Sequence, residues 1–234
     1  MDNQDFSRSR ALNNIPSKKL QAAIKVIEES ADELDVKAIK LTAINRYAES
    51  NIPIEYWGLR MDRDFVGDAR LKQRFDEYVL DLKASYVDGT SICFAGGHGL
   101  GKTMTATCIL KKACQKGYFC LYTNLSDIVS ILTSGSGEDK FLARRELVLV
   151  DFLVIDEVDN RFFKKSEAAN DIFASTLESI VRARLQNKMP IILATNSPQI
   201  RESFTSLYKA SLGSLMSKIE FFSVMPGADF RTSK

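Results

Sequence analysis

The sequence predicts an α/β fold, with helices on both faces of a five-stranded, mostly parallel sheet and a small helical appendage ahead of it. From residue 91 onward, short apolar runs alternate with stretches in which apolar residues recur at helical spacing. This alternation is typical of a parallel sheet whose strands are joined through helices. Two of the runs, 152–155 and 191–194, are almost entirely apolar, which indicates central strands buried on both faces.

The N-terminal part of the chain is expected to form two short helices. Leu20, Ile24 and Ile27 recur at helical spacing after Pro16, and a second such pattern runs over 36–47 before Pro53 ends it. An irregular aromatic linker at 54–65 and a helix over 69–86 lead into the sheet. A chain of 234 residues has room for one α/β domain and a small appendage. We therefore divide it into a helical segment, 1–60, and an α/β domain, 61–234.

The five strands are expected at the apolar runs 91–95, 119–123, 152–155, 191–195 and 221–225. Between the second and third runs, the sequence Ser-Gly-Ser-Gly-Glu at 134–138 has the composition of a flexible loop. A basic stretch with helical character follows at 140–145. The crossover between these two strands is therefore expected to contain a loop and a basic helix.

The composition argues against several classes of protein. The net charge is only +2, so overall electrostatics do not require a nucleic-acid partner. No apolar run is long enough to span a bilayer, and residues 1–10 lack the apolar stretch of a signal peptide. The four cysteines form no C-x-x-C pair and the chain has one histidine, so neither a disulfide framework nor a zinc site is expected. We predict a reduced, cytoplasmic protein with no membrane contact.

The strongest local signal lies between the first expected strand and the helix after it. The motif G-x-x-x-x-G-K-[ST] is matched by Gly96, Gly97, His98, Gly99, Leu100, Gly101, Lys102 and Thr103. Glycines let backbone N–H groups fold around a phosphate, and the following helix adds the positive end of its dipole. We expect Lys102 to reach the β- and γ-phosphates of ATP, Thr103 to bind Mg²⁺, and the contacts to extend to Met104. His98 is expected only to fill space in the loop. The alternative interpretation of the whole motif is a glycine-rich turn that binds no ligand.

A second motif ends the third expected strand, where four apolar residues are followed by Asp156 and Glu157. Two adjacent buried carboxylates are costly without a cation. Mg²⁺ on Asp156, directly or through water, would supply one. Glu157 would then orient and activate the attacking water as a general base. The alternative is an ordinary acidic turn at a strand end.

The fourth expected strand ends in Thr195 and Asn196, which alone would be an ordinary turn. The three motifs in this order resemble those of P-loop ATPases of the AAA+ type. In that class a polar residue after this strand senses the γ-phosphate, and Asn196 takes that place. The resemblance implies that the Asn196 amide holds the lytic water or a γ-phosphate oxygen.

A more specific resemblance covers roughly residues 53–231. The chain is similar to the DnaC/DnaI-type loaders of replicative helicases and to their relatives, the IstB-type transposition ATPases. The matching segments are Ile-Pro-Ile-Glu-Tyr at 52–56, Gly-Tyr at 117–118, Asn-Leu-Ser-Asp-Ile at 124–128, Leu-Gly-Ser-Leu-Met-Ser-Lys-Ile at 212–219 and Gly-Ala-Asp-Phe-Arg at 227–231. The last segment resembles the family's G-x-D-Y-R ending, which implies that no helical lid domain follows the ATPase domain.

The resemblance implies an ATPase that uses ATP and Mg²⁺ to load a replicative hexameric helicase onto single-stranded DNA. The N-terminal helices within 1–60 would hold the helicase, and copies of the protein would associate through the ATP interface. Two other functions stay open. One is a transposition helper that assembles on DNA, although residues 17–50 mix Lys and Glu evenly and so favour a protein partner. The other is a nucleotide-dependent adaptor that does not hydrolyse ATP.

One position departs from the family. Its penultimate helix usually carries an arginine that acts on the γ-phosphate of a neighbouring subunit, but the aligned basic residue here is Lys218. Lysine is a point charge and cannot form the bidentate fork of a guanidinium. Lys218 would then be a weak catalytic residue, or a solvated one, with Arg201, Arg182 or Arg184 as substitutes. Arg182 and Arg184 are expected to be surface charges on a long helix.

Two segments are candidates for contact with DNA. The basic residues Lys140, Arg144 and Arg145 lie where initiator-type AAA+ proteins insert a helix that lines a DNA channel. The second segment combines aromatic and basic side chains, which can stack on bases and attract phosphates; it comprises Phe162, Phe163, Lys164 and Lys165. A solvated face in the first case and a partner-binding loop in the second are the alternatives.

Overall fold

The structure is a computed structural model that describes residues 12, 15–158, 167–197 and 214–225. The helices are α1 (Ser17–Glu28), α2 (Leu34–Glu49), the 3₁₀ turn η1 (Ile54–Tyr56), α3 (Ala69–Leu80), α4 (Leu82–Asp88), α5 (Lys102–Gln115), α6 (Leu125–Ser134), α7 (Gly137–Leu149) and α8 (Glu167–Gln186). The strands are β1 (Ile92–Ala95), β2 (Cys120–Asn124), β3 (Phe152–Asp156), β4 (Ile191–Thr195) and β5 (Glu220–Ser223).

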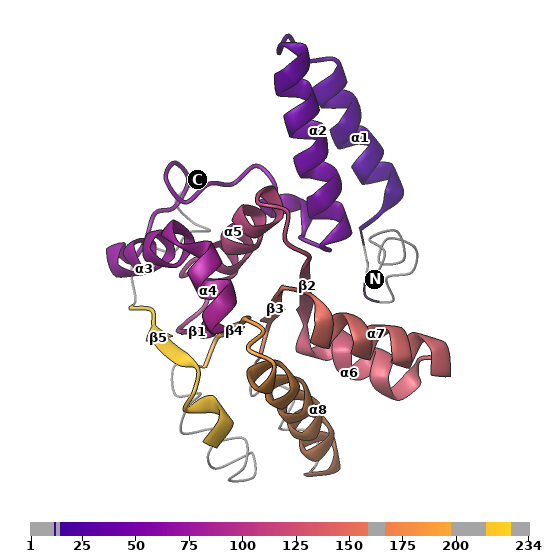
Figure 1. The fold of residues 1–234 in the computed structure, drawn as a ribbon, viewed down its shortest axis with the longest axis vertical. Helices are drawn as coiled ribbons and strands as arrows, with labels where there is room; N and C mark the ends of the chain where they lie inside the picture. Colours follow the sequence, from indigo (N-terminus) through magenta and orange to yellow (C-terminus); the bar gives the residue numbers. More distant parts are fainter. Residues whose placement is uncertain (1–11, 13–14, 159–166, 198–213, 226–234) are drawn as a thin grey trace.

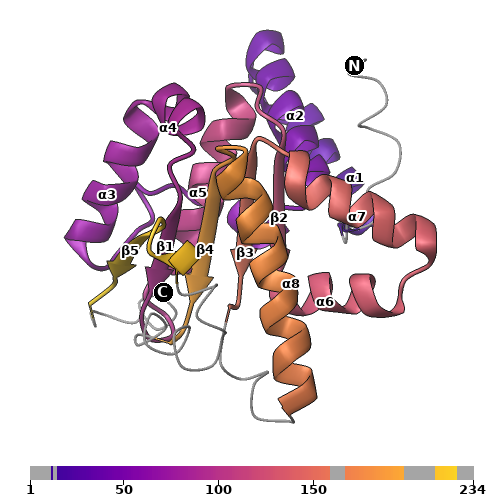
Figure 2. The ribbon, with the colours of Figure 1, turned by 60° about the horizontal axis from the view of Figure 1, so that its bottom comes forward.

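The five strands form one parallel sheet in the order β2-β3-β4-β1-β5. Every residue of β1, β3 and β4 is buried, as the apolar runs predict. One apolar cluster joins α6, α7 and α8 to one face of the sheet, and another joins α2, α3, α4 and α5 to the other. Figures 1 and 2 show this three-layer arrangement. The predicted fold class is confirmed, and all of the described strand pairings are parallel.

Two local predictions were wrong in detail. The helix expected over 69–86 is two helices, because Asp81 leaves the helical conformation (φ −122°, ψ 68°) and its side chain accepts a hydrogen bond from the N–H of Ala84. The loop expected at 134–138 is shorter, since only Gly135 and Ser136 separate α6 from α7. Ser136 caps α7 in a reciprocal pair with Asp139, so the polar residues taken as loop begin a helix.

The α1–α2 hairpin projects from the rest of the molecule (Figure 1), but the end of α2 is attached to the sheet domain. Arg46 donates to the carbonyl of Cys114 on α5 at 2.6 Å. Beyond the helix, the N–H of Tyr122 on the edge strand β2 donates to the Ser50 carbonyl at 2.8 Å. The Asn51 side chain donates to the Tyr122 carbonyl at 3.0 Å. The division of the chain at residue 60 stays a prediction.

The four cysteines are buried. Among the described helices, none combines the length and the apolarity that crossing a bilayer requires.

Candidate nucleotide-binding site

The glycine-rich loop connects β1 to α5 and takes the shape that its sequence requires. Gly99 (φ 73°) and Gly101 (φ 82°) adopt left-handed backbone conformations, and Gly101 is the N-cap of α5. A Cβ on Gly101 would also lie 2.5 Å from the ring of Phe65. Within the described part of the chain, the N-cap Gly101 gives α5 no side-chain cap. The first N–H groups of a helix have no acceptor within the helix and can donate to an anion, as expected for a phosphate-binding loop.

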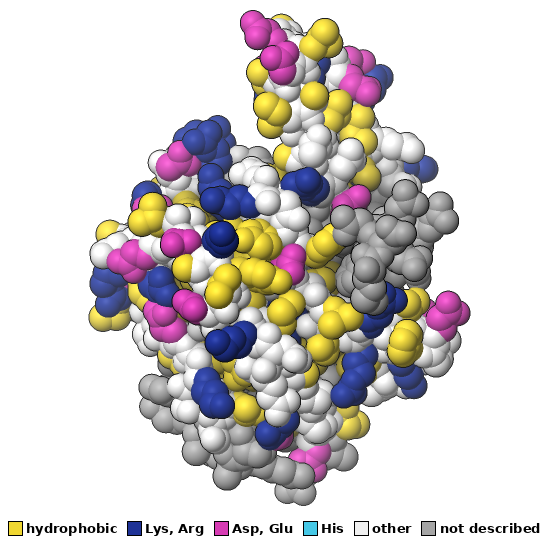
Figure 3. All heavy atoms as spheres, viewed as in Figure 1, with side chains coloured by type: hydrophobic (Ala, Val, Ile, Leu, Met, Phe, Trp, Pro, Cys, Tyr) yellow, Lys and Arg dark blue, Asp and Glu magenta, His cyan; other side chains and the backbone are white. Residues whose placement is uncertain are grey.

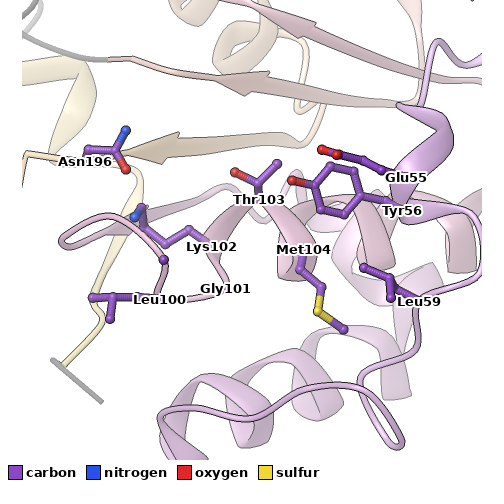
Figure 4. A pocket seen from close by; sticks show the side chains of 10 residues that line it. Glu55, Tyr56, Leu59, Leu100, Gly101, Lys102, Thr103, Met104 and Asn196 are labelled. Carbon is purple, nitrogen blue, oxygen red and sulfur yellow. The ribbon is translucent and has the colours of Figure 1, made fainter. Parts of the chain in front are cut away.

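A pocket of about 430 Å³ opens beside this loop (Figure 4). It brings together the predicted Lys102, Thr103 and Asn196, which come from two separate segments of the chain. The complete lining is Glu55, Tyr56, Leu59, Gly99, Leu100, Gly101, Lys102, Thr103, Met104 and Asn196.

The sequence reasoning missed the wall of the pocket opposite the loop. In Figure 4, the side chains of Glu55, Tyr56 and Leu59 stand on the far side of Thr103 and Met104 from Asn196. They belong to η1 and the turn after it, a segment expected only as an irregular linker. The similarity of 52–56 to a known family was the one signal that could have directed attention to it.

Lys102 is almost completely buried (5% exposed), and its Nζ donates to the carbonyl of Gly97 within the same loop. Thr103 is half-buried in the first turn of α5. His98 is exposed and is not among the lining residues. The loop therefore presents a cation and a hydroxyl at the start of one helix.

Asp156 ends β3 and is 7% exposed. One carboxylate oxygen accepts a hydrogen bond from the Tyr122 hydroxyl at 2.8 Å, and the other accepts from the N–H of Glu157 at 2.7 Å. Burial and the neighbouring negative charge of Asp156 raise the pKa of Tyr122 above its usual range. Tyr122 therefore remains a hydrogen-bond donor that orients this carboxylate, a role that the sequence did not suggest.

Glu157 is exposed and has a left-handed backbone (φ 53°), which is uncommon for a residue with a side chain. The strand therefore ends abruptly between the two acids, leaving one carboxylate buried and the other in solvent. Because β4 lies between β1 and β3, Asn196 follows the strand that separates the loop from the acids. The three motifs thus lie at the carboxyl edge of the sheet, although Asp156 and Glu157 are not among the lining residues of the pocket.

The basic residues that could act on the γ-phosphate of a neighbouring subunit differ in how exposed they are. Arg184 was expected on the surface, and this is wrong: it is fully buried and donates to five backbone carbonyls. Arg182 is partly exposed and pairs with Glu178 at 2.6 Å, and Lys218 is exposed. Arg201 lies outside the described residues, as does the segment Phe162, Phe163, Lys164 and Lys165. Buried Arg184 cannot reach another molecule, which leaves Lys218, Arg182 and Arg201.

Known structures share this fold at low sequence identity. The DnaC helicase loader superimposes with a TM-score of 0.57 and 20% identity, covering 74% of this chain and 100% of that one. DnaI gives a TM-score of 0.55 with 15% identity, covering 74% and 95% of the two chains. The replication initiator DnaA bound to AMPPCP and single-stranded DNA gives 0.59 with 18% identity, covering 77% of this chain. The chain spans about half the length (53%) of that protein.

No curated protein sequence matches the chain significantly. A family model described as IstB-like ATP binding protein matches residues 61–207, which is more than half of the chain and includes the loop, the two acids and Asn196. The structural neighbours agree with the family match in fold. The chain therefore belongs to the IstB-like ATP-binding proteins and has the P-loop AAA+ fold of the DnaC/DnaI type.

Proposed function

We propose that this protein is an ATPase that loads a replicative ring helicase onto single-stranded DNA. The observation that carries the ATPase part is the meeting of three motifs at one edge of the sheet. The loop cation Lys102, the hydroxyl of Thr103 and the amide of Asn196 line one pocket, and the acidic pair ends the strand next to that of Asn196.

The donor set fits a nucleotide with Mg²⁺. The Thr103 hydroxyl and the Asp156 carboxylate are hard oxygen ligands of the kind that Mg²⁺ prefers, and the hydrogen bond from Tyr122 fixes the carboxylate. Mg²⁺ held there would neutralise charge on the phosphates. Lys102 and the N–H groups of the loop would bind phosphate oxygens. The exposed carboxylate of Glu157 would accept the proton of the attacking water, and Asn196 would orient that water.

The ATPase proposal is tested with three variants of the full chain. Lys102→Ala should abolish nucleotide binding, because it removes the buried cation of the loop. Glu157→Gln should bind ATP normally but hydrolyse it about 10²–10⁴-fold more slowly. His98→Ala, in the same loop but exposed, is the matched control and should behave as the wild type. Hydrolysis by Glu157→Gln at the wild-type rate would refute the general-base role. Binding without hydrolysis by the wild type would favour the adaptor function.

The α1–α2 hairpin supports a protein partner. Val26, Leu34 and Ile39 are 70%, 84% and 69% exposed, which is unusual for large apolar side chains so close together in the chain. Figure 3 shows hydrophobic side chains among charged ones on this projecting part. By analogy with the DnaC helicase loader, whose fold is similar, we assign this surface to the helicase.

Light scattering of mixtures with a hexameric replicative helicase, in ATP and in ADP, tests this assignment. Leu34→Asp and Ile39→Asp should abolish the complex and leave nucleotide binding unchanged, since both side chains are exposed. Val87→Asp, at a 59% exposed apolar position on α4, is the matched control and should bind the helicase normally. A complex that survives both hairpin substitutions would contradict the assignment.

Helix α7 supports contact with single-stranded DNA. Phe141 is 67% exposed, and Arg144 and Arg145 follow it by three and four residues, so the three share one side of the helix. An exposed aromatic ring can stack on a base while arginines attract the phosphates. We therefore favour the segment that begins at Lys140 as the DNA contact.

The family match is equally compatible with a transposition helper. Such a protein would assemble on DNA in ATP without binding a helicase. ATP-dependent filaments on double-stranded DNA, together with the absence of a helicase complex, would favour that function over helicase loading.

A further inference from the structure

Lys111 is a buried cation on α5, the helix that begins with the loop residue Lys102. It is only 6% exposed. Its Nζ donates to the carbonyls of Tyr56 at 2.6 Å and Trp57 at 3.4 Å, and also to that of Leu59. Within the described parts of the chain, no carboxylate forms an ion pair with it. Its nearest polar partners are therefore backbone carbonyls, with the Cys108 thiol beside it.

These carbonyls belong to the wall of the candidate nucleotide pocket. The side chains of Tyr56 and Leu59 line the pocket on the side away from Asn196 (Figure 4), while their carbonyls accept from Lys111. The segment follows the single turn η1 and is not part of the sheet. Its own backbone hydrogen bonds are those of turns, such as the bond from the Leu59 N–H to the Tyr56 carbonyl at 3.3 Å. The contact from Lys111 joins this wall to the helix that carries the phosphate-binding residues.

Burial makes this arrangement costly, which indicates that it has a purpose other than packing. Removing the ammonium from water lowers the pKa of Lys111, and a methionine would fill the same space without that cost. The neighbouring Lys112 is exposed and makes no comparable contact in the described structure. The charge at position 111 is therefore best explained by the three carbonyls that it holds.

We propose that Lys111 is a positioning residue that fixes the wall for the base and sugar of the nucleotide, whereas Lys102 and the loop hold the phosphates. The proposal rests on the proposed function, because it assumes that the pocket binds ATP. Since one helix carries both Lys102 and Lys111, it sets the separation between the phosphate cradle and the opposite wall. Loss of Lys111 should therefore weaken the binding of the nucleoside part of ATP and leave the binding of the phosphates unchanged.

The test compares ATP with inorganic tripolyphosphate, which has no base or sugar, by calorimetry on the full chain. Lys111→Met should weaken ATP binding about tenfold and change tripolyphosphate binding less than about twofold. Lys111→Arg should recover part of the loss. Lys112→Met is the matched control, because it makes the same chemical change at an exposed position of the same helix, and should bind both probes normally.

Trp57 gives a second readout, because it is the only tryptophan of the chain and its carbonyl accepts from Lys111. Its indole N–H is fixed by the Ile52 carbonyl at 2.8 Å. ATP should change the Trp57 fluorescence of the wild type and of Lys112→Met, and this response should be lost in Lys111→Met. If Lys111→Met does not fold, Lys111→Gln, which keeps a donor, should show the same division between the probes with a smaller loss.

The outcomes separate the two proposals. A wild type that binds neither probe would overturn the proposed function itself. A wild type that binds both, with a Lys111 variant that loses both equally or loses neither, would overturn the positioning role alone.

Discussion

Arg184 offers a test of how much stability one buried cation supplies to the sheet domain. Its guanidinium donates to the carbonyls of Leu147, Val150 and Pro190 at 2.9, 2.9 and 2.6 Å, and at longer range to those of Val148 and Asp151. Leu147 and Val148 lie in the last turn of α7, whose carbonyls have no partner within the helix. Arg184 therefore ties the end of α7 to the starts of β3 and β4.

Arg184→Met keeps most of the apolar bulk and removes every donor. A buried acceptor that loses its partner costs about 1–3 kcal/mol of stability, so the loss of three short hydrogen bonds would cost several kcal/mol. Part of this loss of stability is offset, because removing the guanidinium also removes an unfavourable buried charge: burial lowers the pKa of Arg184 to about 9. We expect a net loss of about 3–5 kcal/mol in the free energy of unfolding. For a chain of this size that corresponds to a fall in Tm of about 10 °C.

Thermal and urea unfolding followed by circular dichroism would measure the loss, with Arg182→Met as control. Arg182 has a 43% exposed side chain and pairs with Glu178, so its removal should shift Tm by less than about 2 °C. ATP hydrolysis per folded molecule should be unchanged in Arg184→Met at low temperature. A variant as stable as the wild type would refute this reasoning, and one that kept its stability but lost hydrolysis would point to a catalytic role for Arg184.

Three further predictions concern the site and its surroundings. Gly101→Ala should weaken ATP binding more than about tenfold, because the backbone of Gly101 is left-handed and an added Cβ would meet Phe65. Gly97→Ala is the control: its Cβ would have only Leu100 nearby, at 3.8 Å, so this variant should bind ATP normally in the same titration. Tyr122→Phe should raise the Mg²⁺ concentration for half-maximal hydrolysis at least about tenfold, as the hydrogen bond to Asp156 is lost; an unchanged Mg²⁺ dependence would exclude the orienting role. Arg144→Ala should weaken single-stranded DNA binding and reduce its salt slope by about 1, whereas an unaltered slope would place the contact elsewhere.

The sheet and the phosphate loop could be predicted from sequence because their signals are local. The strands β1, β3 and β4 are almost contiguous apolar runs, and the glycine pattern of 96–103 lies between a strand and a helix. The alternation of strands and helices is likewise visible along the chain. The break at Asp81 was missed because its cause is a side chain that bonds to a nearby N–H, which apolar spacing does not record.

The contacts of polar side chains with partners far away in the sequence could not be predicted. Arg184 and Lys111 both occupy helices rich in charged residues, where a cation is normally solvated. Most of their partners are backbone carbonyls tens of residues away, and carbonyls carry no signature in a sequence. Tyr122 was assigned to a strand, but its contact with Asp156 depends on the pairing of β2 with β3. The same limit applies to the pocket wall at 55–59, which is assembled by these contacts.

The contact between Tyr122 and residues 50–51 has a consequence for the solubility of the protein. β2 is an outer strand of the sheet, and an outer strand with open N–H and C=O groups is a template for pairing with another chain. The Ser50 carbonyl and the Asn51 amide occupy both groups of Tyr122, in the middle of β2. The end of the N-terminal hairpin thus shields the sheet against aggregation. A shortened protein that begins after Ile52 should aggregate through this strand, whereas one that begins ahead of Tyr47 should remain monodisperse.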